Sequence, residues 1–107
     1  SVDTIVTQTA SVFNAEQQCV YDTLAAELER LASPILDKLQ KGEVRTQIEA
    51  NNIVSQFVIT SSNLIREQAK NEEAEFNKQL TDKGLELMVD YQTKFYNYTQ
   101  KLPLGID

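Results

Sequence analysis

The residue types that carry most enzyme and metal chemistry are sparse in this chain. Histidine is absent, so serine and cysteine triads that use histidine as the general base are excluded. Carboxylates are plentiful, and Asp82, Glu86 and Asp90 stand four residues apart, which places them on one face of a helix. Paired carboxylates hold a metal or transfer protons when they are buried together. No EF-hand loop surrounds this row, and we interpret it as a solvated face.

Cys19 is the one cysteine of the chain and lies on the flank of an expected helix, beside its apolar stripe. This position favours a small buried hydrophobic residue. An intermolecular disulfide is the alternative if the chain works outside the cytoplasm, because an unpaired cysteine invites one there. No histidine or cluster of cations lies nearby to activate the thiol. We therefore expect no catalytic residue, no metal site and no cofactor.

The charge balance excludes another group of functions. The chain has 10 basic and 16 acidic residues and a net charge of −6, whereas nucleic-acid binding needs clustered lysines and arginines. The basic residues stand singly, so no polybasic segment is present for an anionic membrane surface. No apolar run approaches the roughly 18 residues that a membrane span requires. We expect no nucleic-acid partner and no membrane span.

The elements that must position any site are read from the apolar spacing. Apolar residues recur mostly three, four or seven positions apart from Val2 to Leu39, which predicts an amphipathic helix. Pro34 interrupts this pattern, because its ring clashes with the preceding turn and it lacks an N–H donor. Two outcomes stay open: a kink near Ala32, or a split with a short helix over residues 34–41. Gly42 is predicted to end the helix.

A second helical pattern runs from Glu43 to Leu80, and its broad apolar face includes Ile53, Phe57 and Val58. Residues 53–60 are β-branched enough to suggest a strand. No turn signal and no partner strand flank them, so we predict a helix through this stretch.

The C-terminal part of the chain predicts one more helix. Residues 81–84 combine Thr, Asp, Lys and Gly and form the next expected break. A short helix rich in aromatic residues follows over residues 85–102 and ends before Pro103. We expect residues 104–107 to be frayed.

Tyr91, Phe95 and Tyr98 follow one another at spacings of four and three residues. This spacing favours three rings that anchor the last helix to the core. The alternative is a lining for an apolar ligand or a hot spot for a protein partner. Asn97 also begins an N-glycosylation sequon, Asn-Tyr-Thr, which matters only in a secreted eukaryotic protein.

Together these elements predict an all-α fold and a single helical domain over residues 1–107. We expect an antiparallel bundle of three or four helices, with the first helix kinked or split at Pro34 and a short C-terminal aromatic helix. Helices this long in a chain this short would leave apolar area exposed, including part of the face at Phe57 and Val58, and exposed apolar area typically marks an interface. We expect self-association, most simply as a two-fold dimer, or a heterologous protein partner.

For function, we interpret the chain as a non-enzymatic helical interaction module that presents amphipathic helix faces to a protein partner or to itself. The alternative is a carrier or sensor domain that binds a small apolar ligand in a pocket between helices. The amide- and hydroxyl-rich composition slightly favours a secreted or periplasmic mature form and leaves the compartment open. The candidate interaction or pocket residues are Phe13, Ile53, Phe57, Val58, Phe76, Tyr91, Phe95 and Tyr98.

Overall fold

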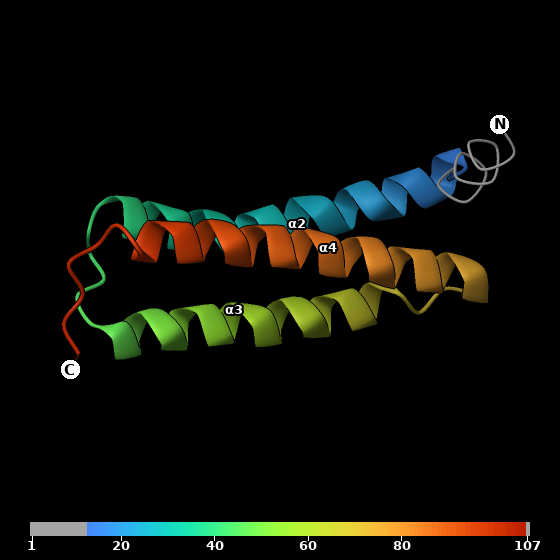
Figure 1. Ribbon diagram of the computed structural model, residues 1–107. Coiled ribbons are helices and arrows are strands. Elements are labelled where there is room, and N and C mark those ends of the chain that lie inside the picture. The colour runs from blue at the N-terminus through green and yellow to red at the C-terminus, as the bar shows by residue number, and fades with distance from the viewer. Residues whose placement is uncertain (1–12, 107) are drawn as a thin grey trace, which may run out of the picture.

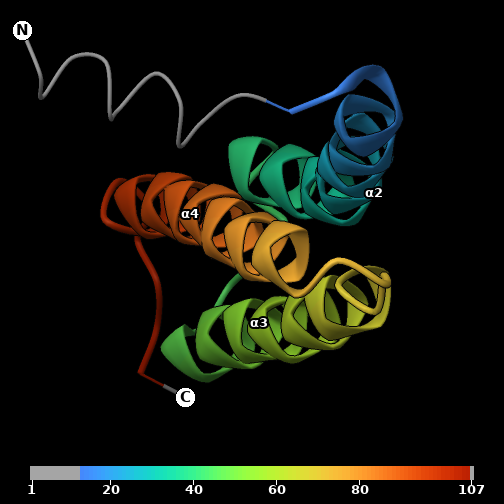
Figure 2. The same cartoon turned by 90° about the vertical axis from the view of Figure 1, so that its right-hand side faces the viewer.

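The computed structural model describes residues 13–106 and contains three packed helices. These are α2 (Ala15–Gln40), α3 (Gln47–Gln68) and α4 (Ala74–Thr99), and each one contacts the other two. Successive helices run in opposite directions (Figure 1), and together they enclose a shared core (Figure 2). The predicted all-α fold with a bundle of three helices is confirmed. The part of the first predicted helix that covers residues 2–12 lies outside the described residues.

Both ends of α2 are fixed by local sequence. Asn14 and Gln17 form a capping box, in which each side-chain oxygen accepts a hydrogen bond from the other residue's backbone N–H, at 2.8 and 3.1 Å. At the other end, Gly42 adopts a positive φ of 68°, and the N–H of Glu43 donates to the carbonyl of Lys38 at 3.0 Å. This is the Schellman arrangement that glycine allows, so the predicted stop at Gly42 is confirmed.

Pro34 does not divide α2. The helix continues through it to Gln40, so the predicted split is wrong. Proline removes one backbone donor from the helix, but the side chains on both sides of it, including Ala32 and Leu39, are buried in the core. Pro34 itself is exposed. Packing of the apolar face therefore holds the helix together across the missing hydrogen bond.

Helix α3 is shorter than the sequence predicted. The side chain of Thr46 caps its start by accepting from the N–H of Glu49 at 3.1 Å, and the helix ends at Gln68. The turn that follows is braced by two asparagines, because Asn77 accepts from the N–H of Asn71 at 2.9 Å and donates to its carbonyl at 2.7 Å. The predicted helix from residue 43 to residue 80 is therefore wrong at both ends, whereas the predicted helix over residues 53–60 is confirmed.

Helix α4 begins where the sequence was expected to continue α3, and it passes through the expected break. Gly84 lies in the interior of this 26-residue helix, so the predicted break at residues 81–84 and the separate short helix after it are wrong. A methyl group on Gly84 would lie 2.9 Å from Cγ1 of Ile65. The glycine thus allows close approach of α3 and α4 rather than a turn.

The C-terminal tail crosses from α4 to the start of α3 (Figure 2). The N–H of Gly105 donates to the carbonyl of Arg45 at 2.9 Å, and the N–H of Gln47 donates to the carbonyl of Gly105 at 2.8 Å. Leu102 and Leu104 pack against the core. The expected fraying of the tail is therefore wrong for residues 104 and 105, and Asp107 lies outside the described residues.

The core runs the length of the bundle and is made by side chains from all three helices and the loop that follows α2. The molecule is elongated, with a radius of gyration of 16.8 Å and principal extents of 51, 32 and 18 Å. The buried apolar residues are Leu24, Leu28, Ala32, Leu39, Val44, Ala50, Phe57, Ile65, Phe76, Leu80, Met88 and Phe95.

Candidate functional site

Three of the eight candidate residues form one aromatic cluster between α3 and α4. The ring of Phe57 meets that of Phe95 edge to face, with centroids 4.9 Å apart, and that of Tyr91 at 6.1 Å. Phe57 and Phe95 are buried, and Tyr91 is half-buried. Burial raises the pKa of Tyr91 above its ordinary value, and the negative charge of Glu29 raises this pKa further. These rings fill the core and fix the C-terminal half of α4.

A second cluster lies at the other end of α4. Phe13 and Phe76 pack edge to face with centroids 5.3 Å apart, and Tyr21 lies 6.0 Å from Phe13. The ammonium group of Lys83 lies 5.7 Å from the centre of the Phe13 ring, within cation–π range. Phe76 and Phe95 are about 28 Å apart along α4. The candidate residues Phe13 and Phe76 are therefore in a different cluster from Phe57, Tyr91 and Phe95.

The remaining candidates lie at the edge of the core. Ile53 and Val58 are half-buried on α3, and the hydroxyl of Tyr98 accepts a hydrogen bond from Nε2 of Gln40 at 2.8 Å, which joins α4 to α2. Phe57 is only 3% exposed, so the expectation that it stays partly exposed in a single chain is wrong. The neighbouring helix α4 covers it.

The surface between α3 and α4 carries a groove that none of the eight candidate residues lines. We call it the neutral groove. It has a volume of about 650 Å³, and none of its ten lining residues is charged. It is lined by Gln47, Ala50, Asn51, Val54 and Ser55 from α3 and by Val89, Gln92, Thr93, Tyr96 and Thr99 from α4.

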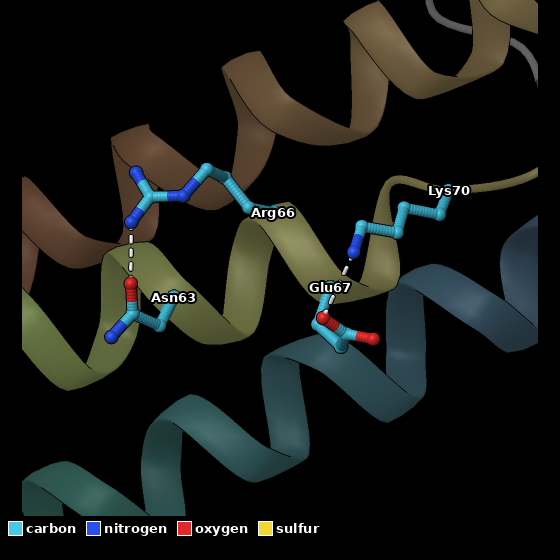
Figure 3. Close-up of polar contacts among 4 residues, drawn as sticks. All are labelled: Asn63, Arg66, Glu67 and Lys70. Carbon is cyan, nitrogen blue, oxygen red and sulfur yellow. Dashed lines mark hydrogen bonds and ion pairs between the residues drawn. The ribbon is translucent and has the colours of Figure 1, made fainter.

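The α3 wall of the neutral groove belongs to a longer uncharged stretch. No charged residue occurs in α3 between Glu49 and Arg66, although 24% of the chain is charged. Charges return at the C-terminal end of α3. There Arg66 donates to the side chain of Asn63, and Lys70, just after the helix, pairs with Glu67 at 3.2 Å (Figure 3). These contacts mark the limit of the uncharged surface.

Exposed apolar side chains occur on both helices, and two of those on α4 line the groove. On α4, Val89 and Tyr96 line it and are 51% and 62% exposed, and Leu85 precedes them on the same side. On α3, Ile48 and Ile59 are half exposed. Ile48 and Ile59 are eleven residues apart, as are Leu85 and Tyr96. Because eleven residues make about three helical turns, the two members of each pair point in the same direction from their helix.

Chemically, the neutral groove offers amides, hydroxyls, one phenol and apolar surface. Sequence reasoning missed it because the outer row of α4, which includes Val89 and Tyr96, has the same helical spacing as the core row and merges with it. One signal was available: the sixteen residues from Ala50 to Ile65 contain no charge.

Other hollows differ in character. A smaller one of about 280 Å³ lies between α2 and α3 and is mainly apolar, lined by Leu31, Ile35, Ile53, Gln56, Phe57 and Thr60. Another lies beside the acidic row of α4 and is lined in part by Tyr21, Lys83 and Leu85, with Asp82, Glu86 and Asp90.

The residues first considered for chemistry are on the surface. The carboxylates of Asp82, Glu86 and Asp90 are exposed, and within residues 13–106 no group of three or more His, Cys, Asp or Glu side chains could hold a metal ion. Cys19 is exposed, so its expected burial is wrong. Asn97 is exposed on α4.

No helix in the described part of the chain has the length and apolar character needed to cross a lipid bilayer. Comparisons with protein-family models, with curated protein sequences and with solved structures give no match to this chain.

Proposed function

We propose that this chain is a non-enzymatic helical interaction module and that the neutral groove between α3 and α4 is its docking surface. The observation that carries the proposal is the composition of this surface. It combines exposed apolar side chains, Val89 and Tyr96, with uncharged polar groups on two rigid helices. Interface cores are depleted in charged residues and enriched in tyrosine.

The groups lining the groove also support a binding role over a catalytic one. Amides and threonine hydroxyls donate and accept hydrogen bonds but do not act as general bases near neutral pH. The one titratable group among the ten lining residues is the phenol of Tyr96. No carboxylate, amine or thiol lies beside it in this lining to activate a hydroxyl.

In this proposal the aromatic end of α4 has a positioning role. Phe95 is buried against Phe57, and this contact fixes the rotation of α4 so that the next residue, Tyr96, faces outward. The hydroxyl of Tyr98 holds the same segment to α2. A kink at Pro34 would complete the arrangement by curving the last turns of α2 around the core.

Site-specific photo-crosslinking tests the docking surface. A photo-reactive amino acid placed at Gln92, inside the groove, is expected to give a discrete protein adduct in the native extract. The same amino acid at Asn97 is the matched control, because Asn97 is exposed on the same helix and outside the groove lining. Adducts of equal yield at both positions, or none at Gln92, would contradict the proposal.

The second candidate function is a carrier or sensor of a small apolar ligand. It is favoured by the hollow between α2 and α3, where Leu31, Ile35, Ile53 and Phe57 supply apolar walls. Its volume of about 280 Å³ is near the lower limit of ligand pockets. Native mass spectrometry of the purified chain tests this function, because a retained ligand adds a discrete mass and an empty chain adds none.

A further inference from the structure

We propose that the docking surface binds an amphipathic helix of another protein, and that this helix carries lysines or arginines along one edge of its apolar face. This inference rests on the proposed function and names the partner of that surface. The spacing of the apolar side chains on α4 and the unequal charge on the two sides of them support it.

The outward side chains of α4 form a stripe with helical spacing, which we call the outer stripe. Its members follow one another at intervals of four, three and four residues: Leu85, Val89, Gln92 and Tyr96. The apolar members Leu85, Val89 and Tyr96 are 39%, 51% and 62% exposed. Two helices that pack nearly parallel interlock side chains at these intervals. A partner helix that lies along α4 would therefore contact the whole stripe, which is about 17 Å long.

The two borders of the outer stripe differ in charge. Toward α3 lies the neutral groove, whose lining carries no charged residue. On the other side lies the acidic row of α4, Asp82, Glu86 and Asp90, which is exposed and shares a hollow of about 510 Å³ with Leu85 and Val89. A partner helix on the stripe would therefore meet carboxylates along one edge and neutral groups along the other. Charges at the edges of a helix pair select the partner, and this edge selects a basic one.

The carboxylates of the acidic row are available to such a partner. Within residues 13–106 none of them forms an ion pair. Two lysines of the same helix lie over aromatic rings instead. The ammonium group of Lys83 is 5.9 Å from the centre of the Tyr21 ring, and that of Lys94 is 5.5 Å from the centre of the Tyr91 ring. The net charge of −6 also favours a basic partner over a second copy of this chain, because like charges that face each other destabilise an interface.

Binding of labelled synthetic peptides to the purified chain, measured by fluorescence anisotropy, tests the partner. The lysine peptide is a helix of about five turns, with leucines at intervals of four and three residues and lysines along one edge. It is expected to bind with a micromolar Kd, because one helix covers less area than a stable dimer needs. A glutamate peptide, with the lysines replaced, is expected to bind more weakly. A scrambled lysine peptide is the control for general attraction of a cation to an acidic chain, and it is also expected to bind more weakly.

Substitutions in the chain show where the peptide binds. Glu86→Lys is expected to weaken binding of the lysine peptide by roughly tenfold at low ionic strength and to strengthen binding of the glutamate peptide, and salt is expected to reduce both effects. Glu72→Lys is the matched control, because Glu72 is exposed in the turn before α4 and outside the hollow beside the acidic row. Tyr96→Ser is expected to weaken binding of the lysine peptide through loss of apolar contact. Circular dichroism melting checks that the variants stay folded.

Failure of the lysine peptide to bind, equal affinity for the lysine and glutamate peptides, or equal effects of Glu86→Lys and Glu72→Lys overturns the proposed partner. A wild-type dimer in sedimentation equilibrium that Tyr96→Ser dissociates also overturns it, because a second copy would then occupy the outer stripe. The crosslinking result decides the proposed function separately. If Gln92 captures a protein although the lysine peptide does not bind, the docking surface stands with a partner of another kind. If neither gives a complex, both proposals fail.

Discussion

Ser61 is a polar side chain that the core buries completely, and its hydroxyl finds no hydrogen-bond partner among residues 13–106. A buried hydroxyl without a partner costs about 1 to 3 kcal/mol. Ser61→Ala is therefore expected to raise the free energy of unfolding by about 1 kcal/mol or more, measured by urea denaturation. Ser33→Ala is the control, because it removes a serine hydroxyl at an exposed position inside α2 and gives a similar gain in helix propensity. Equal effects of the two substitutions would contradict this reading of Ser61.

Tyr91 makes the stability of the bundle depend on pH in the alkaline range. Burial, together with the charge of Glu29, raises its pKa above the ordinary value of 10.0, so above pH 10 the unfolded chain loses the phenol proton before the folded chain does. The unfolded state then binds fewer protons, and stability falls as pH rises through this window. Tyr91→Phe keeps the ring and removes the proton. Urea denaturation at several pH values is expected to show that the free energy of unfolding falls less at alkaline pH for Tyr91→Phe than for wild type.

At the scale of elements, the end of a helix could be predicted where the residues that terminate it are adjacent in the sequence. Gly42 ends α2 through its own positive φ and nearby backbone bonds, and this was visible in the sequence. Gly84 is also a glycine, but its role is to make room for the side chain of Ile65, which is nineteen residues away in the sequence. Such a contact leaves no local mark, so the sequence predicted a break there and extended α3 through a turn made of polar residues.

Gly84→Ala tests whether this glycine serves packing. Alanine in a helix interior is favoured over glycine by about 1 kcal/mol, but its methyl group would lie 2.9 Å from Cγ1 of the buried Ile65. We expect Gly84→Ala to lower the free energy of unfolding by about 1 to 3 kcal/mol. In an Ile65→Ala background, which removes the clashing atoms, the same substitution is expected to be neutral or stabilising. A double-mutant cycle from thermal or urea melts measures this coupling.

The residues of the candidate site also differ in whether the sequence alone could identify them. Apolar periodicity identified Phe57, Phe76 and Phe95, and all three are buried in the core. Periodicity marks the face of a helix that is apolar, so it finds core residues first. Val89 and Tyr96 were missed because α4 has a second apolar row, and their exposure depends on where α2 and α3 leave α4 uncovered. That is decided by the packing of whole helices.

For the whole molecule, α4 is the element that completes the core, because it packs against both α2 and α3. Its last turns supply Phe95, which is fully buried against Phe57. A chain that ends at Asp90 would lose this ring and the tail that hydrogen-bonds to Arg45. The apolar side chains left uncovered on α2 and α3 would then face water.

Loss of one large buried side chain costs about 3 to 5 kcal/mol, and a small domain has only about 5 to 15 kcal/mol of stability in total. We therefore expect the chain ended at Asp90 to lose its cooperative thermal transition in circular dichroism. A chain ended at Lys101 is the control, since it keeps Phe95 and all of α4, and it is expected to melt cooperatively at a reduced temperature. If the chain ended at Asp90 melted at the same temperature as the full chain, the C-terminal half of α4 would not belong to the core. Its aromatic residues would then be free to form a binding surface themselves.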